Sequence, residues 1–220
     1  MEAADVVRGL DLGALAPPGR PYVVLNMAAT ADGRVAIGGR SAPVAGPADR
    51  ELFHALRAQA DAVMAGAATA RVERYRPFRV PALGVFVSGS LDLPADLPIL
   101  ADADSRVVVI TRSEASLGDV AADVTYLRQR ESELAPALAA LRSEFGVRSV
   151  LCEGGPHLND SLLREGLVDE LFLCVSPKLA GDSSQPAGVE GLALPEPVGL
   201  ELVSLHEADD HVFFRYRVSS

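Results

Sequence analysis

The chain has 220 residues, 49% of them hydrophobic and 23% charged, a balance typical of a globular protein and unlike disordered or collagen-like chains. Thirty acidic residues against 20 basic ones give a formal net charge of −10, which argues against nucleic acids and anionic membranes as partners. The N-terminal residues lack the basic and apolar regions of a signal peptide, and no apolar stretch approaches the ~20 residues that span a bilayer. We therefore expect a soluble cytoplasmic protein.

At this length we expect one domain, with at most an appended arm. Residues 1–20 end in the helix-breaking sequence PPGRP, which predicts a mobile or weakly helical N-terminal arm before a domain of residues 21–220. Cys152 and Cys174 each lie in an apolar run, where a small buried thiol is expected. The spacing of the cysteines and histidines spells out no metal-ligand or redox pair.

Strand-like and helix-like patterns alternate along the domain. Short apolar runs predict strands at 22–27, 62–65, 83–87, 106–111, 124–127, 149–152, 170–176, 200–205 and 211–218. Helical spacing of apolar residues predicts helices from 47 through 60, from 67, at 134–145 and at 156–165. Asp32-Gly33 predicts a hairpin turn into residues 34–37, and residues 181–197 a Gly/Pro-rich surface loop. The pattern predicts an α/β fold with three αβα layers, a central first strand and a C-terminal antiparallel hairpin at the sheet edge.

Two glycine turns come directly after buried strands and before helices. Glu153-Gly154-Gly155-Pro156 follows the strand at 149–152, and Gly66 to Thr69 follows the strand at 62–65. Ligands of open α/β sheets bind beyond the carboxyl ends of strands, where helix N-termini offer unpaired N–H groups. Both turns are therefore candidate pyrophosphate sites. Each could equally be a simple turn, and neither has the spacing of a GxGxxG motif.

Three charged side chains are candidate site residues, each with a structural alternative. Glu153 ends an apolar strand, so its carboxylate must be solvated, paired or in use; it could also stabilise the following helix N-terminus. Asp32 could simply form the hairpin turn, and Arg57 could be a solvated helix residue. The four histidines have neither metal-ligand spacing nor a nucleophile motif beside them, so the sequence supports no metal site and no hydrolase triad.

Four segments of the chain are similar to one known family. They are PYVVLNMAATADGRVA, LRAQADAVMAG, GAATAR and LCEGGPHLNDSLLREGLVDELFLCVSPKLAGD. Over residues 21–217 the chain resembles the reductase domain of the bifunctional riboflavin-pathway deaminase-reductase, in the dihydrofolate reductase-like superfamily. The resemblance implies a dihydrofolate reductase-like mixed sheet. It also implies NADPH-dependent reduction of 5-amino-6-(5-phosphoribosylamino)uracil, a small molecule, to the ribitylamino product.

The resemblance also implies which residues form the site. The NADPH site would be lined by Ala28, Thr69, Glu73, Gly155, Pro156, His157, Leu158, Asn159, Asp160 and Ser161. The substrate would be bound by Ser41, Arg57 and Glu153, with Arg57 as a fork for the substrate phosphate. No residue is an obvious general acid, and Glu153, Asp32 or water held by either would bring the proton to the opened ribose oxygen. Arg71 or Arg112, near strand ends, could pair with the 2′-phosphate of NADPH.

The chain departs from the family pattern after Thr69. Where the family reads GTxxxDDPxLT, this chain reads GAATARVERYRP, with Glu73 and Arg74 in place of two aspartates. A dihydrofolate reductase-like or orphan reductase with another pterin or pyrimidine substrate is therefore an alternative, and a non-catalytic nucleotide-binding protein is another. The zinc ligands of the deaminase domain are absent, which predicts a reductase alone. The resemblance and the apolar segments at 166–177 and 211–218 predict a homodimer.

Overall fold

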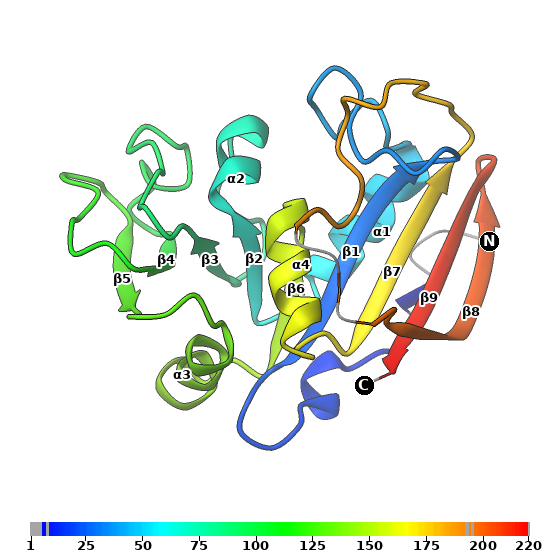
Figure 1. The fold of residues 1–220 in the computed structure, drawn as a ribbon. Coiled ribbons are helices and arrows are strands. Elements are labelled where there is room, and N and C mark those ends of the chain that lie inside the picture. The colour runs from blue at the N-terminus through cyan, green and yellow to red at the C-terminus, as the bar shows by residue number, and fades with distance from the viewer. Residues whose placement is uncertain (1–5, 8, 192–193, 195, 220) are drawn as a thin grey trace.

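The computed structural model describes residues 6–7, 9–191, 194 and 196–219, and these form one nine-stranded sheet with helices on both faces (Figure 1). The strands are β1 (Tyr22–Thr30), β2 (Ala62–Gly66), β3 (Leu83–Val87), β4 (Arg106–Thr111), β5 (Asp123–Arg128), β6 (Ser149–Cys152), β7 (Glu170–Ser176), β8 (Gly199–Ala208) and β9 (His211–Ser219). Their order is β5-β4-β3-β2-β6-β1-β7-β9-β8. The first seven strands in this order are parallel, and the β8–β9 hairpin closes one edge antiparallel to β7.

The helices cover both faces of this sheet and make three layers. They are α1 (Pro47–Arg57), α2 (Ala67–Glu73), α3 (Ala135–Phe145) and α4 (Pro156–Arg164), with a short 3-10 turn η2 (Leu12–Leu15). Helices α3 and α4 lie in front of the sheet in Figure 1, and α1 lies behind it. The predicted three-layer α/β class is therefore confirmed. Within the described residues no helix is long and apolar enough to cross a bilayer.

Apolar side chains on the two sheet faces hold the layers together. Leu138 of α3 and Leu162 of α4 are fully buried against one face, and Leu52 and Leu56 of α1 are buried against the other. Each such side chain contributes roughly 1.5–3 kcal/mol when it leaves water. Because neighbouring residues of a strand point to opposite faces, a one-residue slip would exchange these two sets, so burial fixes the register. The register in turn places the carboxyl ends of β2 and β6 beside the middle of β1, where Leu25 is paired with Cys152.

The predicted hairpin after β1 is wrong. The turn itself forms, because Gly33 has a positive φ of 80° and its N–H bonds to the Thr30 carbonyl at 2.8 Å. Residues 34–37 nevertheless form no strand beside β1; Arg34 makes only an isolated bridge to Ala187. The strand β1 is central, as predicted, and β7 pairs with it as far as Thr30 on one side. On the other side β6 ends opposite Leu25, and residues 34 and 35 contact the loop at Pro186 and Ala187 instead of returning along β1.

Part of the predicted N-terminal arm packs against the domain where the structure describes it. Leu12 is fully buried and Val7 nearly so, and both belong to the apolar cluster beneath α1. Residues 1–5 and 8 of the predicted arm, and residues 192, 193 and 195 of the predicted loop, lie outside the described residues. The other elements match their predicted bounds within about three residues, a usual margin for element ends.

Candidate functional site

A continuous cleft lies at the carboxyl ends of the parallel strands, as expected for an open α/β sheet. It consists of three adjoining cavities of about 550, 290 and 700 Å³, which we call the glycine groove, the central cavity and the arginine cavity. Thr69, in the first turn of α2, lines all three. The cleft is therefore one candidate site with three compartments.

The glycine groove lies between the first turns of α2 and α4 and the ends of β3 and β4. Gly154 and Gly155 both have positive φ, near 90°, which a residue with a side chain rarely adopts. A Cβ on Gly155 would also lie 3.0 Å from Thr69 Oγ1, so the turn leaves no room for one. No described side chain caps the first turn of α4, so its N–H groups are available to an anion. The groove thus fits the phosphates of a dinucleotide cofactor.

Most of the residues predicted for the cofactor site do line the cleft. Thr69, Gly155, Pro156, His157, Leu158 and Ser161 line the glycine groove, while Ala28 and Glu73 line the central cavity. Asn159 and Asp160 line neither. Asn159 is fully buried and donates to the Gly188 carbonyl at 2.8 Å, and Asp160 pairs with Arg164 at 2.9 Å. Helical periodicity explains the split, because these two residues lie on the other side of α4, where Asn159 binds the loop that follows β7.

Both arginines predicted for a 2′-phosphate line the glycine groove, but only one is unpaired. Arg71 Nη1 forms an ion pair with Asp92 at 2.7 Å. The guanidinium of Arg112 is exposed, lies against Gly89, and has no hydrogen-bond or ion-pair partner among the described residues. Arg112 is therefore the better placed of the two to receive a phosphate.

Arg57 and Glu153 form a buried network instead of two separate ligand contacts. The Arg57 fork donates through Nε and Nη2 to the two Glu153 carboxylate oxygens at 2.6 and 2.7 Å. Tyr75 Oη donates to the same carboxylate at 2.6 Å, and the guanidinium lies 4.2 and 4.9 Å from the ring centroids of Phe53 and Phe78. Burial and the neighbouring Glu153 raise the pKa of Tyr75 well above its ordinary value. The Arg57 fork, predicted to bind a phosphate, is thus already occupied by Glu153.

Asp32 lies outside the three cavities and is held by its own surroundings. Thr30 Oγ1 donates to it at 2.6 Å, and the N–H groups of Ala180 and Gly181 donate at 3.0 and 2.8 Å. These hydrogen bonds, that of Thr30 most of all, lower the pKa of Asp32 far below its ordinary value. The geometry gives Asp32 a role in fixing the loop and does not favour it as a proton donor.

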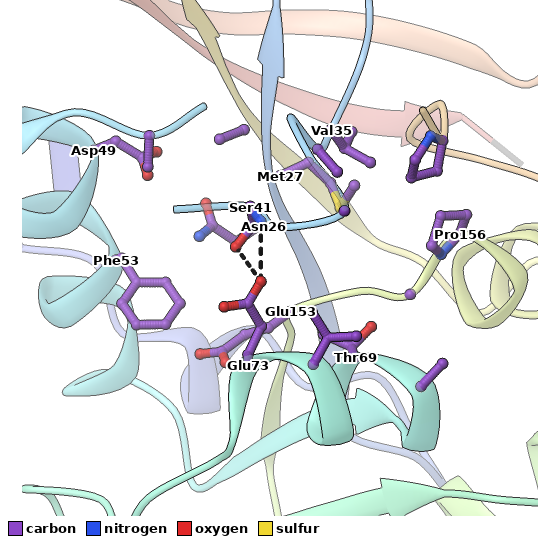
Figure 2. Close-up of a pocket in the computed structure, with 18 residues that line it drawn as sticks. Asn26, Met27, Val35, Ser41, Asp49, Phe53, Thr69, Glu73, Glu153 and Pro156 are labelled. Carbon is purple, nitrogen blue, oxygen red and sulfur yellow. Dashed lines mark hydrogen bonds between the residues drawn. The ribbon is translucent and has the colours of Figure 1, made fainter. Parts of the chain in front are cut away.

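Ser41 and Glu73 meet at the wall of the central cavity. The Ser41 hydroxyl and N–H donate to one Glu73 carboxylate oxygen at 2.8 and 3.0 Å, as the dashed lines in Figure 2 show. One residue was predicted for the substrate and the other for the cofactor, and they stand 32 positions apart in the chain. Their contact indicates that the two ligands would meet here.

Sequence reasoning missed several residues of the cleft. Asp49 lines the central cavity while being only 7% exposed, although acidic residues in a first helical turn usually face solvent. The sequence pattern could have indicated this position. Helical spacing places Asp49 on the same inward face of α1 as the apolar residues Leu52, Phe53 and Leu56. In the arginine cavity the sequence indicated Ser41, Arg57, Thr69, Glu73 and Glu153 but not the other charged residues. This cavity is lined by His54, Arg74, Arg76 and Arg79 together with Arg57, Tyr75 and Glu153.

Comparisons with known proteins agree with this geometry. Residues 21–214 match the model of the RibD C-terminal domain. The chain is 31% identical over 215 residues to the 2,5-diamino-6-ribosylamino-4(3H)-pyrimidinone 5′-phosphate reductase of Methanothermobacter thermautotrophicus, covering 90% of this chain and 99% of that one. It is 29% identical to the riboflavin biosynthesis protein RibD of Actinobacillus pleuropneumoniae, covering 91% of this chain and 58% of the relative.

Solved structures show the same fold. A pyrimidine reductase-like protein from Corynebacterium diphtheriae superposes with a TM-score of 0.85 and 23% identity, each chain being covered completely. The RibD of Acinetobacter baumannii superposes with a TM-score of 0.77 and 25% identity over 92% of this chain and 59% of that one. The family match and the 31% identical relative confirm the resemblance seen in the sequence. The chain therefore belongs to the RibD C-terminal domain family, whose relatives are named as reductases of the riboflavin pathway.

Proposed function

We propose that the chain reduces the ribosyl group of a phosphoribosylamino-pyrimidine to a ribityl chain, with 5-amino-6-(5-phosphoribosylamino)uracil as substrate and NADPH as reductant. The observation that carries the proposal is the continuous cleft, in which an anion-binding groove opens into a cavity lined by polar side chains. Relatives named as riboflavin-pathway reductases support it. A protein that only bound a nucleotide in the glycine groove would not need the central cavity and the arginine cavity.

The glycine groove is the proposed NADPH site. The first-turn N–H groups of α4 would bind the pyrophosphate, and Arg112 would pair with the 2′-phosphate that distinguishes NADPH from NADH. Bound there, the nicotinamide supplies a hydride, and the protein has to orient the acceptor and exclude water. A cytoplasmic location, which we also propose, fits the two free cysteines.

The other two compartments are the proposed substrate site. Arg76 and Arg79 line the arginine cavity, and neither has an ion-pair partner among the described residues. They can therefore bind the substrate phosphate in place of the occupied Arg57 fork. Ser41 and Glu73 would contact polar groups of the substrate where it meets the cofactor. The network of Arg57 and Glu153 forms the wall between the central and arginine cavities and would position the ribose.

A turnover assay tests the proposal and its main alternative. The protein is mixed with NADPH and, in separate reactions, with 5-amino-6-(5-phosphoribosylamino)uracil, the 2,5-diamino-pyrimidinone analogue and dihydrofolate. We expect oxidation of NADPH with a phosphoribosylamino-pyrimidine and none with dihydrofolate. Turnover of dihydrofolate alone would favour the dihydrofolate reductase-like alternative. No turnover with any of the three would reject the enzyme assignment.

We also propose a homodimer formed through one sheet face. Facing residues of β8 and β9, with Leu202 opposite Tyr216 and Leu205 opposite Phe214, leave an apolar face, and Leu202 is 53% exposed. In Figure 1 no helix lies in front of β8 and β9. Edge strands with this much apolar surface are normally covered. Sedimentation of the wild type should give twice the monomer mass of 23.1 kDa, and sedimentation of Leu202→Lys should give the monomer mass. A monomeric wild-type protein at micromolar concentration would contradict the proposal.

A further inference from the structure

The proposed reduction needs a proton at a defined atom. When a hydride adds to C1′ of the ribosylamine, a C1′–H bond forms and the C1′–O4′ bond breaks. The electron pair of the broken bond moves to O4′. O4′ must then receive a proton to become a hydroxyl of the ribityl chain. The acid must reach the cavity where the ribose lies and must hold its proton near neutral pH. This inference rests on the proposed function and asks which side chain supplies that proton.

Three carboxyl groups line the central cavity, namely Glu73, Glu153 and Asp49. Glu153 accepts three hydrogen bonds, two of them from the cationic fork of Arg57, an arrangement that suits a carboxylate. Glu73 accepts two from Ser41 and is partly exposed to solvent. Both therefore act as hydrogen-bond acceptors. Asp32 lies outside the cleft, and its hydrogen bonds lower its pKa far below the ordinary value.

Asp49 differs from these carboxyl groups in its surroundings. It lies in the first turn of α1, 7% exposed, and its side chain extends from α1 toward the side on which Asn26 lies, across the cavity from Thr69 and Pro156 (Figure 2). The Cys174 thiol of β7 interacts with its carboxyl group. Among the described residues, neither an arginine fork nor a backbone N–H binds this carboxyl group. A carboxyl group buried in this way favours its neutral, protonated form.

The groups packed around Asp49 do not reverse this preference for the protonated form. Burial raises the pKa of Asp49, and the opposing effects of Cys174, of His211 on β9 and of Arg50 on α1 are smaller. Burial, with Asp49 nearby, raises the pKa of the Cys174 thiol, so the thiol keeps its proton and can donate it in a hydrogen bond. His211 Nδ1 lies 2.7 Å from the Asp209 carbonyl, and its buried Nε2 has no partner. Glu73 and Glu153 line the same cavity but are not among the groups that shift the pKa of Asp49.

We propose that Asp49 is the acid that protonates the ribose ring oxygen. As the C1′–O4′ bond breaks, O4′ takes the proton of the Asp49 carboxyl group; the hydride added to C1′ would come from the reduced nicotinamide, which would be oxidised. The carboxylate that remains lies in the first turn of α1, whose N–H groups and dipole favour a negative charge. Solvent entering after product release then restores the proton.

The test compares Asp49→Asn with Glu51→Gln, an exposed acid two residues further along α1 that undergoes the same replacement of a carboxyl group by an amide. We expect kcat of Asp49→Asn to fall on the order of 10² or more, with KM and NADPH affinity little changed, while Glu51→Gln keeps wild-type kcat. Wild-type kcat should decrease as pH rises through the pKa of Asp49. Formate, a small acid that fits the space left by the side chain, should restore part of the turnover of Asp49→Ala.

Infrared spectroscopy gives a readout that needs neither substrate nor cofactor. The protein alone at neutral pH should show the carbonyl stretch of a protonated carboxylic acid, which Asp49→Asn should lose and Glu51→Gln should keep. If Asp49→Asn folds normally and turns over the pyrimidine at the wild-type rate, or if the band is missing from the wild type, the acid role is wrong and the proposed function stands. If the wild type reduces no phosphoribosylamino-pyrimidine, both the proposed function and the proposed role of Asp49 are wrong.

Discussion

Replacement of Glu153 by Gln tests the buried network at the centre of the cleft. The change removes one negative charge and turns a carboxylate oxygen, which accepts hydrogen bonds, into an amide group that donates them. Arg57 Nη2 and Tyr75 Oη both donate to Glu153 Oε2, so the new amide cannot satisfy all its neighbours. Arg57 would keep a buried charge with no full counterion, because its side chain is only 18% exposed.

The expected loss of stability follows from that burial. Neutralising one partner of a buried ion pair typically costs about 3–5 kcal/mol. Arg57 borders the arginine cavity, where water can reach it, so we expect the lower end, about 3 kcal/mol. A chain of 220 residues has an unfolding entropy of about 0.46 kcal/mol/K, so Tm should fall by about 6 °C. A Glu153 that only stabilised the N-terminus of α4 would cost at most about 1 kcal/mol, or about 2 °C.

Thermal and urea unfolding of Glu153→Gln, Arg57→Met and the double variant measure this difference. In the Arg57→Met background, Glu153→Gln should cost less than about 1 kcal/mol, because no buried cation is left without a partner. Turnover of the single variant should also fall by about 10², since the displaced fork no longer holds the wall of the central cavity. A Tm within about 2 °C of wild type, with no coupling between the two changes, would refute the network as the main role of Glu153.

Three further results are expected. Arg112→Ala should weaken NADPH binding about tenfold or more and leave NADH binding unchanged in a fluorescence titration; equal losses would contradict a 2′-phosphate contact. Gly155→Ala should weaken both cofactors, because its Cβ would lie 3.0 Å from Thr69 Oγ1 at a positive φ; unaltered affinity would rule out close backbone approach. Asp49 has a pKa raised above its unfolded value of 3.8, so its contribution to stability is full below that value and is lost as pH rises through the folded pKa. Asp49→Asn should therefore gain stability relative to wild type as pH rises from 3.8 through the folded pKa of Asp49, and a constant difference would argue against a buried acid.

Local sequence patterns were sufficient for most of the elements. The apolar runs at 83–87, 149–152 and 170–176 became strands with the predicted bounds, and Gly146 ends α3 in the left-handed conformation. Such features depend on a few neighbouring residues, whose side-chain spacing and backbone preferences act over one or two turns. The hairpin after Asp32 failed because Arg34 and Val35 contact the loop at Pro186 and Ala187, about 150 positions away, and such a contact is a property of the tertiary structure.

The glycine groove shows how far the sequence by itself determined the site. The Glu-Gly-Gly-Pro turn between β6 and α4 is a local feature, and its position beyond a parallel strand follows from the βαβ pattern. On α4, helical periodicity then decides which predicted residues reach the groove. His157, Leu158 and Ser161 face it, whereas Asn159 and Asp160 face the loop behind.

Only the tertiary structure decided how the charged residues are used. Arg57 and Glu153 stand 96 positions apart, and the sheet order that brings β6 between β1 and β2 makes them a buried pair. Asp49 looks like an ordinary acid in a first helical turn, but α1 packs against the sheet and turns it into the cavity. Burial and charge pairing depend on distances between remote segments, and those distances set the energy of each ionised group. The sequence therefore determined which groups are available, and the packing of the chain decided which of them are paired, exposed or protonated.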